Sequence, residues 1–331
     1  METQRSQKLQ LKKHVDLDGS LRTKQKKTSA KRKIFSRLLF ATAISSVAML
    51  FTNCTNRGKL IRKSTAPHFK NWVCNYNEKA DPQDLAKFDL IVLDADSHPD
   101  LQLLTTNKAL LIGYLSLGEV GDYRWYWPEI KDKPWVLAKN PNWDSRMIDV
   151  RSKEWQNMIL DKIIPRILQD GFNGLFLDTI DNAEYLEKYH PQQTLPGSEA
   201  AMVDLIKRIR TTFPGIYLIV NRGFSLTEKI AASVDAIVAE SLFSEVNFDN
   251  NTVQLRPTGN ISPIIKTLSR AANRFHLQIL TLDYFDKQKP ENIDKLITSA
   301  RQYGFVPYIS TVNLQTTYMF TLGNKRKANE N

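Results

Sequence analysis

Three carboxylates stand directly after short apolar runs, where packing gives no reason for a charge. Asp178 follows Leu-Phe-Leu, Glu240 follows Ile-Val-Ala, and Asp283 follows Leu-Thr-Leu. Two carboxylates can hydrolyse a glycoside: one acid protonates the leaving oxygen, and the other attacks the anomeric carbon or activates water. The five histidines and two cysteines show no metal-ligand spacing. The sequence therefore predicts carboxylate chemistry, with no cofactor and no metal.

Eight apolar runs, each a candidate strand, alternate with helical patterns from about residue 71 onward. The runs are continuously apolar, as expected for parallel strands that are buried on both faces. They cover residues 72–76, 89–94, 110–116, 174–178, 216–221, 235–240, 277–283 and 305–310. Eight strands alternating with helices over about 250 residues predict an α/β fold, a single-domain (β/α)8 TIM barrel. The competing hypothesis is an open doubly wound sheet, which requires a Gly-rich turn after the first strand; Asn75-Tyr76-Asn77 stands there instead.

Helix signals lie between several of these runs. Ser152 and Ser198 are the expected N-caps of helices at 152–171 and 198–215, and a third helix is expected at 290–304. Pro165 falls inside the first of them and predicts a kink.

The active site of such a barrel lies at the C-terminal ends of its strands. The polar residues at these ends are Tyr76, Asp94 with Asp96, Glu119, Asp178 with Asp181, Asn221 with Arg222, Glu240, Asp283 with Tyr284, and Ser310 with Asn313. A polar residue that merely marks a turn explains any one of these positions. The whole set favours a functional rim.

A loop rich in aromatic residues follows the third run. Residues 118–128 read GEVGDYRWYWP and supply Tyr123, Arg124, Trp125 and Tyr126. Aromatic rings stack on sugar faces, and Arg side chains bind hydroxyls or charges. Binding and packing both remain open as roles for these four residues.

The positive charge of the chain belongs to its first part. Residues 1–63 hold 16 Lys and Arg against three acids, a net charge of +13, whereas the remainder holds 30 against 32, a net charge of −2. A nucleic-acid groove in the body is therefore not expected. The basic residues precede the uncharged run LLFATAISSVAMLFT at 38–52, the layout of a secretory signal or membrane anchor, and Cys54 follows as a candidate for lipidation. A lipoprotein signal, an uncleaved anchor and ordinary cleavage remain open, and each predicts export to the bacterial cell envelope.

Five motifs together resemble glycoside hydrolase family 114. They are YLSLGEVGDYRWYW at 114–127, GFNGLFLDTIDN at 171–182, VNRG at 220–223, DAIVAESLF at 235–243 and LTLDYF at 280–285. The resemblance implies a (β/α)8 barrel with endo-α-1,4-polygalactosaminidase activity. It implies Asp178 and Glu240 as the catalytic pair, with Glu119, Asp283 and Tyr284 at further positions of the site. One departure is VNRG, where members of the family often read close to QNG; Arg222 adds a cation that would suit an acidic sugar.

The residues and the resemblance together assign roles. We expect a retaining hydrolase with Asp178 as nucleophile and Glu240 as general acid/base. The expected substrate-binding residues are Asp94, Glu119, Tyr123, Arg124, Asp181, Asn221, Arg222, Asp283 and Tyr284. A non-catalytic carbohydrate-binding barrel is the alternative. A weaker one is a lyase or aldolase that holds a divalent cation with Glu119, Asp178 and Asp283.

The expected organisation divides the chain into five parts. Residues 1–37 form a basic tail, 38–53 a hydrophobic signal or membrane anchor, 54–70 a linker, 71–318 the barrel and 319–331 a polar C-terminal tail. The expected partners are a polysaccharide substrate and, through the N-terminal lipid or hydrophobic segment, a membrane. Nucleic acid is not an expected partner, and the protein is expected to be a monomer.

Overall fold

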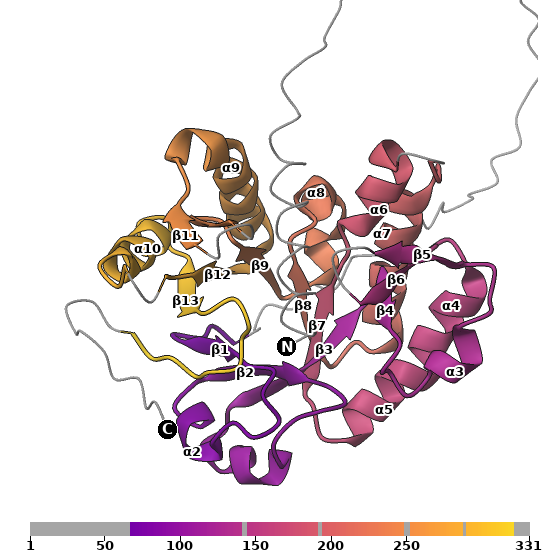
Figure 1. Cartoon of the computed structure of the whole chain (residues 1–331), viewed down its shortest axis with the longest axis horizontal. Helices are drawn as coiled ribbons and strands as arrows, with labels where there is room; N and C mark the ends of the chain where they lie inside the picture. Colours follow the sequence, from indigo (N-terminus) through magenta and orange to yellow (C-terminus); the bar gives the residue numbers. More distant parts are fainter. Residues whose placement is uncertain (1–66, 141–143, 191–193, 248–251, 287–288, 321–331) are drawn as a thin grey trace, which may run out of the picture.

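Eight parallel strands form the central sheet of the protein (Figure 1). The computed structural model describes residues 67–140, 144–190, 194–247, 252–286 and 289–320. The strands are β1 (Trp72–Cys74), β2 (Leu90–Asp94), β3 (Leu110–Ser116), β7 (Gly174–Asp178), β8 (Tyr217–Asn221), β9 (Ala236–Glu240), β12 (Gln278–Tyr284) and β13 (Val306–Ser310). They coincide with the eight predicted runs, so those strand predictions are confirmed.

The sheet curls until its edge strands lie side by side. The indole Nε1 of Trp72 in β1 donates to the Val306 carbonyl of β13 at 3.1 Å, and its ring lies 5.7 Å from that of Tyr308. In the part of the chain that the structure describes, backbone pairing does not continue from β13 to β1. The strands follow one another in chain order, as in a barrel and unlike a doubly wound sheet. The fold is therefore TIM-barrel-like, and the expected α/β class is confirmed.

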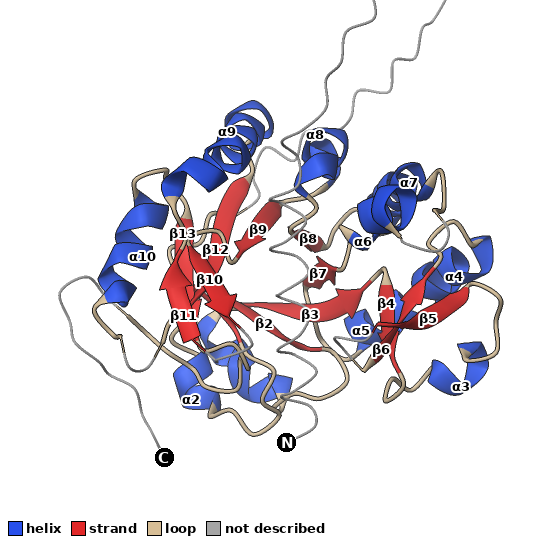
Figure 2. Cartoon of the chain, turned by 45° about the horizontal axis from the view of Figure 1, so that its top comes forward, coloured by secondary structure: helices blue, strands red, loops and turns tan. Residues whose placement is uncertain are grey.

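Helices connect the strands and lie outside the sheet (Figure 2). They are α2 (Pro82–Leu85), η1 (Leu101–Asn107), α4 (Lys153–Met158), η2 (Ile159–Ile163), α5 (Ile164–Gln169), α6 (Asn182–Glu184), η3 (Tyr185–Tyr189), α7 (Ser198–Thr212), η4 (Phe224–Leu226), α8 (Thr227–Ile230), η5 (Ala231–Ser233), α9 (Thr258–Phe275) and α10 (Asn292–Arg301). Their apolar faces pack on the strands, which are consequently buried on both sides.

Two helix signals have different outcomes. Ser152 is the N-cap of α4 as predicted, since its hydroxyl accepts from the Trp155 N–H at 3.3 Å. The prediction for Ser198 is wrong: Gly197 occupies the N-cap with φ +88°, and the Ser198 hydroxyl donates to the Leu195 carbonyl instead. A left-handed residue at this point suits glycine, which has no side chain to clash.

The predicted kink at Pro165 takes the form of a wide helical turn. Proline has no N–H to donate to the preceding turn, and its ring needs room there. The chain meets this need with the π-helical turn η2, directly before α5, which carries Pro165 in its first turn.

The sequence patterns did not indicate several insertions. A small antiparallel sheet of β4 (Glu119–Gly121), β5 (Val136–Asn140) and β6 (Ser145–Ile148) follows β3, together with α3 (Trp127–Ile130). A hairpin of β10 (Ser244–Asn247) and β11 (Thr252–Leu255) follows β9. Both insertions leave the C-terminal ends of barrel strands, the region where the predicted site residues also lie.

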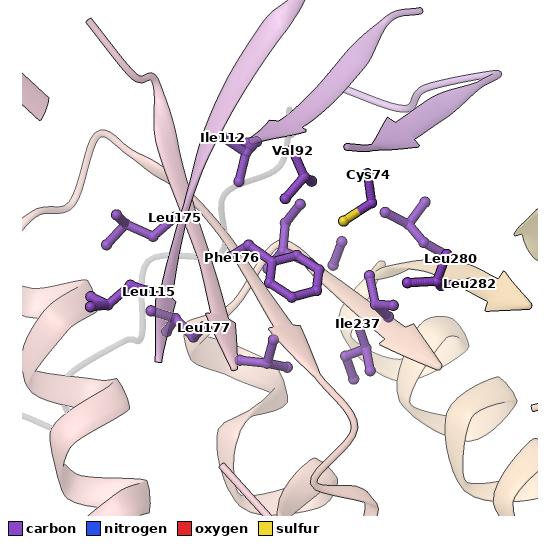
Figure 3. Close-up of a cluster of buried hydrophobic side chains, with 14 of the residues drawn as sticks. Cys74, Val92, Ile112, Leu115, Leu175, Phe176, Leu177, Ile237, Leu280 and Leu282 are labelled. Carbon is purple, nitrogen blue, oxygen red and sulfur yellow. The ribbon is translucent and has the colours of Figure 1, made fainter. Parts of the chain in front are cut away.

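Packing inside the barrel supports the ends of the strands. Successive strand residues point to opposite faces, so Phe176 and Asp178 of β7 share one face. Figure 3 shows the Phe176 ring among Cys74, Leu280 and other buried apolar side chains from neighbouring strands. The inward face of β7 is therefore packed with apolar side chains and ends in a carboxylate.

Some predictions fall on segments outside the described residues. These include the tail at 1–37, the hydrophobic run at 38–53, Cys54, and residues 321–331. Within the described segments, none of the helices has the length and apolar character needed to cross a membrane.

Candidate active site

Asp178 and Glu240 lie close together at the ends of β7 and β9. Each is the half-buried last residue of an otherwise buried strand. Asn221, the last residue of the intervening strand β8, donates through its single Nδ2 atom to both: to Asp178 Oδ1 at 3.0 Å and to Glu240 Oε2 at 2.7 Å. Three neighbouring parallel strands thus present a carboxylate, an amide and a carboxylate side by side.

Two tyrosines complete the hydrogen bonding of this pair. Tyr114 of β3 donates its hydroxyl to Asp178 Oδ2 at 2.8 Å, and Tyr284 of β12 donates to Glu240 Oε1 at 2.6 Å. Tyr76, just beyond β1, packs edge-to-face with Tyr114, with the two ring centroids 5.3 Å apart. Every oxygen of the two carboxylates therefore has a neutral donor and a fixed direction.

This arrangement raises the pKa of the Asp178 carboxyl group. Burial, and then the negative charge of Glu240, raise the pKa of the Asp178 carboxyl to about 6. The hydrogen bonds from Tyr114, the Thr179 N–H and Asn221 act in the opposite direction, because they favour the charged form. Two carboxylates in such contact resist simultaneous ionisation, which is a property useful for acid/base chemistry.

The backbone turns sharply after each of three site residues, Asp178, Asn221 and Glu240, which form the central trio. Thr179, Arg222 and Ser241, which directly follow Asp178, Asn221 and Glu240, all have positive φ, at 58°, 58° and 52°.

This conformation is unfavourable for residues with a side chain, at a cost of about 1–3 kcal/mol each, and it clusters at functional sites. Packing of the barrel offsets that cost here. The trio therefore lies at three strained strand ends.

Arg124 joins the predicted residues of β2 to the site. Its guanidinium forms a two-pronged ion pair with Asp94, at 2.9 and 2.8 Å, and reaches Asp96 at 2.7 Å. It also lies 5.6 Å from the ring centroid of Tyr114. Burial disfavours its charge, but the Asp94 carboxylate outweighs that effect and holds the pKa of Arg124 above its usual range. Arg124 and Asp94 are thus bound to each other, beside Tyr114.

The aromatic loop divides between exposed and packed rings. Tyr123 is 72% exposed. Tyr126 is buried and packs on Trp155, while Trp125 lies under the guanidinium of Arg166, 4.7 Å from its ring centroid. Of the three aromatic residues at 123, 125 and 126, Tyr123 is the one that presents its ring to solvent.

Glu119 lies in a buried network instead of on an open rim. Its side chain accepts hydrogen bonds from Asn140 at 2.9 Å, Asn182 at 2.7 Å and Ser145 at 2.5 Å, and the residue is 3% exposed. These donors come from β5, α6 and β6. The carboxylate therefore ties the inserted small sheet to the loop after β7.

Asp283 has a similar position on the other side of the site. It is fully buried, and its Oδ1 accepts from the N–H groups of Phe243 and Ser244, at 2.7 and 2.9 Å, and from the Ser244 hydroxyl at 3.0 Å. Burial raises the pKa of its carboxyl to about 6. Asp283 thus fixes the loop after Glu240, while Tyr284 points to the opposite face of β12 and reaches Glu240 itself.

Asp181 and Arg222 pair with each other. The Nε of Arg222 donates to Asp181 Oδ2 at 3.2 Å, and its Nη1 donates to the Glu240 carbonyl at 3.1 Å. The Arg222 side chain is 11% exposed. Asp181 therefore balances the cation that the sequence places beside the site, and Arg222 supports the main chain of Glu240.

Tyr114 is the functional residue that sequence reasoning did not single out. A signal existed, because Tyr114 is the one hydroxyl-bearing aromatic in the run Leu-Leu-Ile-Gly-Tyr-Leu, four residues after the run begins. Its partner became visible only through the strand register, in which Tyr114 opposes Phe176, two residues before Asp178.

Metal binding would need several ligand side chains in one place. Among the described residues, no group of three or more His, Cys, Asp or Glu side chains is arranged to hold a metal ion. Glu119, Asp178 and Asp283, the three candidate ligands of the lyase hypothesis, each accept hydrogen bonds from a different set of donors.

Two of the curated proteins similar to this chain have no assigned function. An uncharacterized protein of Thermotoga maritima is 23% identical over 283 residues, covering 76% of this chain and 83% of that protein. An uncharacterized protein of Methanocaldococcus jannaschii is 26% identical over 261 residues, covering 70% of this chain and 73% of that protein.

The solved structures that share the fold include a glycoside hydrolase domain and a protein solved with galactosamine. The glycoside hydrolase domain of PelA from Pseudomonas aeruginosa matches with a TM-score of 0.65 at 23% identity, covering 75% of this chain and 97% of that domain. Ega3 of Aspergillus fumigatus, solved in complex with galactosamine, matches with a TM-score of 0.58 at 13% identity, covering 74% of this chain and 92% of that one.

The sequence profile of one family matches most of the chain. The profile is that of glycoside-hydrolase family GH114, and it matches residues 55–326. This span includes the whole barrel and every residue of the site described above. The chain therefore belongs to glycoside hydrolase family GH114.

Proposed function

We propose that this glycosidase cleaves α-1,4 bonds within a galactosamine-type polysaccharide, with retention, using Asp178 as nucleophile and Glu240 as general acid/base. The observation that carries the proposal is the shared donor: Asn221 Nδ2 binds one oxygen of each carboxylate. A single amide can bridge the two only if they face the same small volume, which is what a pair acting on one glycosidic bond requires.

The close approach of one oxygen of each carboxylate is compatible with retention. The two hydrogen bonds to Asn221 measure 3.0 and 2.7 Å, so the oxygens they join are at most about 5.7 Å apart. Retaining enzymes place their carboxyl groups about 5–5.5 Å apart, whereas inverting enzymes need about 6.5–9.5 Å to admit a water molecule.

The hydrogen bonds support the division of roles. Three donors, from Tyr114, the Thr179 N–H and Asn221, favour the charged form of Asp178, whereas Glu240 accepts side-chain hydrogen bonds from Asn221 and Tyr284. The proposed roles place the negative charge on Asp178, which these three donors stabilise, and the transferred proton on Glu240. An ionised Asp178 is the nucleophile, and a protonated Glu240 is the acid.

The reaction then follows two balanced steps. In the first step an Asp178 oxygen attacks the anomeric carbon, the glycosidic bond breaks, and Glu240 gives its proton to the leaving oxygen. In the second step Glu240 removes a proton from water, the water oxygen attacks the anomeric carbon, and the bond to Asp178 breaks. The sum is hydrolysis, and both carboxyl groups return to their starting states.

Charge supports an amino sugar as the substrate. The residues around the site include five carboxylates, from Asp94, Asp96, Asp178, Asp181 and Glu240, against two guanidiniums, from Arg124 and Arg222. Both guanidiniums are bound to carboxylates, so the residual charge is negative and attracts an ammonium group. Arg222 therefore does not favour an acidic sugar. The galactosamine complex of Ega3, a protein of the same fold, agrees with this choice.

One experiment tests the proposal directly. The purified protein is incubated with defined polymers of galactosamine, N-acetylgalactosamine and uronic acid, and the anomer first released is followed by NMR. We expect cleavage of the galactosamine polymer with retained α configuration, and a loss of at least about 1,000-fold in Asp178→Asn and Glu240→Gln. Full activity in both variants, or release of the β anomer, would overturn the assignment.

The same variants address the alternatives. A non-catalytic sugar-binding barrel would bind the polymer but release no product in the wild type. A metal-dependent lyase or aldolase would lose activity in EDTA, whereas the two-carboxylate mechanism predicts the same rate with and without the chelator.

Export to the cell envelope is part of the proposal and rests on the N-terminal sequence. We propose that residues 1–53 direct export and that Cys54 carries lipid. Incorporation of labelled fatty acid, present in the wild type and absent in Cys54→Ser, is the expected result. Equal labelling of both, or of neither, contradicts the lipid assignment.

A further inference from the structure

Tyr123 is the most exposed of the large apolar or aromatic side chains among the described residues that lie open to solvent. It is 72% exposed, against 57% for Leu103, 41% for Tyr303 and 36% for Tyr189. Packing therefore accounts for little of its position. What fixes the ring is a set of contacts on its protein side.

The first of these contacts is with Gly121 in β4. A Cβ built on Gly121 would fall within 2.9 Å of Tyr123 Cζ and even nearer to its Cε1, so the ring occupies the space that a side chain would take. Gly121 is buried and pairs with Ser145 of β6. The ring thus rests on the backbone of a small sheet.

The second contact is with Arg124. Its guanidinium carbon lies 4.9 Å from the Tyr123 ring centroid, within the range of a cation–π interaction. Arg124 is 7% exposed and is held by Asp94 and Asp96. Because Gly121 and Arg124 are both buried, they lie on the protein side of the ring and leave its outer surface open.

Arg124 and Tyr114 connect the Tyr123 ring with the proposed catalytic pair. The same guanidinium lies 5.6 Å from the centroid of Tyr114, whose hydroxyl donates to Asp178 at 2.8 Å. Tyr123 is therefore separated from the proposed nucleophile by one guanidinium and one phenol. This row of contacts leads from the proposed nucleophile to the exposed ring.

We propose that Tyr123 is the platform of a second sugar subsite, which stacks on the C–H face of another pyranose of the same bound chain. The inference rests on the proposed function and adds a determinant of substrate length to it. A ring that is already fixed loses little freedom when a sugar binds, and aromatic surfaces provide most of the contact area in such sites. Asp96, which binds Arg124 through Oδ2 and whose side chain is 25% exposed, places a carboxylate beside the platform for an amino group.

Kinetics on substrates of increasing length test this subsite. Galactosamine oligosaccharides, from the shortest that is cleaved upward, are assayed with the wild type and Tyr123→Ala. We expect KM to rise about three- to tenfold for the longer oligosaccharides with kcat nearly unchanged, and no change for the shortest. Tyr303→Ala, which removes an exposed tyrosine that stacks on Phe243, is the matched control and should leave both constants unchanged.

A second variant moves the ring without removing it. Gly121→Ala puts a methyl group where the Tyr123 ring lies, and the ring, which is 72% exposed, has room to swing outward. We expect the same length-dependent rise in KM as in Tyr123→Ala, and no further rise in the double variant. Equal KM values in the wild type and Tyr123→Ala at every length, or a uniform loss that includes the shortest substrate, would overturn the subsite.

Failure of the subsite and failure of the proposed function give different results. If the wild type cleaves another polymer in place of galactosamine chains, the substrate assignment fails, and the Tyr123 comparison is repeated on that polymer. If no polymer is cleaved, titration of Asp178→Asn with galactosamine oligosaccharides, with and without Tyr123→Ala, tests the platform by binding alone. Equal affinities in that titration would overturn it.

Discussion

Asp178 and Glu240, which are 62 residues apart in the chain, accept hydrogen bonds from one and the same nitrogen atom. That nitrogen belongs to Asn221, which has no charge of its own. It draws together two groups that repel each other when both are ionised, and it does so without a cation that would quench their acid/base chemistry. A neutral bridge of this kind leaves one proton to be shared by the pair.

Removal of the bridge should separate and weaken the pair. In Asn221→Ala both carboxylates lose a donor, so we expect kcat to fall about 10- to 100-fold. The acid limb of the pH–rate profile should move to higher pH, because the Asn221 bond lowers the pKa of Asp178. Kinetics over a range of pH measure both effects.

Asn182→Ala is the matched control for this experiment. Asn182 is an amide buried to the same degree, at 4% against 3% exposed, but it donates to Glu119. We expect a loss of folding stability with no shift of the acid limb. A shift as large as that of Asn221→Ala would show that the effect is general disruption.

Activity should depend on pH through Asp178. The nucleophile must be ionised, and its pKa is raised to about 6 by burial and by Glu240. We therefore expect kcat/KM to fall about tenfold per pH unit below pH 6. An acid limb near pH 4 would show that Asp178 ionises like an ordinary carboxyl group.

The two tyrosines should have distinguishable effects. Tyr114→Phe removes a donor that lowers the pKa of Asp178, so kcat should fall about tenfold and the acid limb should move to higher pH. Tyr284→Phe removes the donor to Glu240 and leaves the bond from Tyr114 in place. It should lower the rate while the acid limb stays, and identical profiles for the two variants would contradict the separate roles.

Asp283 should make folding stability depend on pH. Its pKa in the folded protein, about 6, exceeds the ordinary value of 3.8. The stabilisation is therefore fully present below about pH 4 and is lost as pH rises through 6, a change of about 3 kcal/mol. Asp283→Asn cannot ionise, so the difference in unfolding free energy between pH 4 and pH 7 should shrink by about that amount.

Urea denaturation at the two pH values measures this difference. Asp144→Asn, at a side chain that is 59% exposed, is the control and should leave it unchanged. An unaltered difference in Asp283→Asn would show that Asp283 is not the group responsible.

The strands could be predicted because their environment leaves a mark on each residue. Parallel strands buried on both faces demand unbroken apolar runs, and the change from Leu177 to Asp178 then marks where a strand meets the site. For the same reason the carboxylates could be identified as a group. The resemblance to the family already implied the pairing of Asp178 with Glu240, whereas the bridge through Asn221 needed the strand order as well.

The rest depends on contacts between distant residues. Glu119 and Asp283 lie near strand ends like Asp178, yet both are buried by distant parts of the chain that supply their donors, and nothing local in the sequence distinguishes them from Asp178. Tyr114 is the opposite case. It lies within an apolar run, and its place in the site depends on Asp178 of the neighbouring strand. The prediction for Ser198 failed because the preceding glycine could adopt a left-handed conformation that the capping rule ignores.

The left-handed turns at Thr179, Arg222 and Ser241 also bear on how this protein can change over time. Each turn carries the chain away from the barrel immediately after Asp178, Asn221 or Glu240. The loops that follow therefore begin only after these three residues. Those loops can lengthen, shorten or change composition while the side chains of Asp178, Asn221 and Glu240 stay anchored on rigid strands. Substrate range can therefore diversify through changes in the loops, while the barrel keeps the three side chains of the candidate site in place.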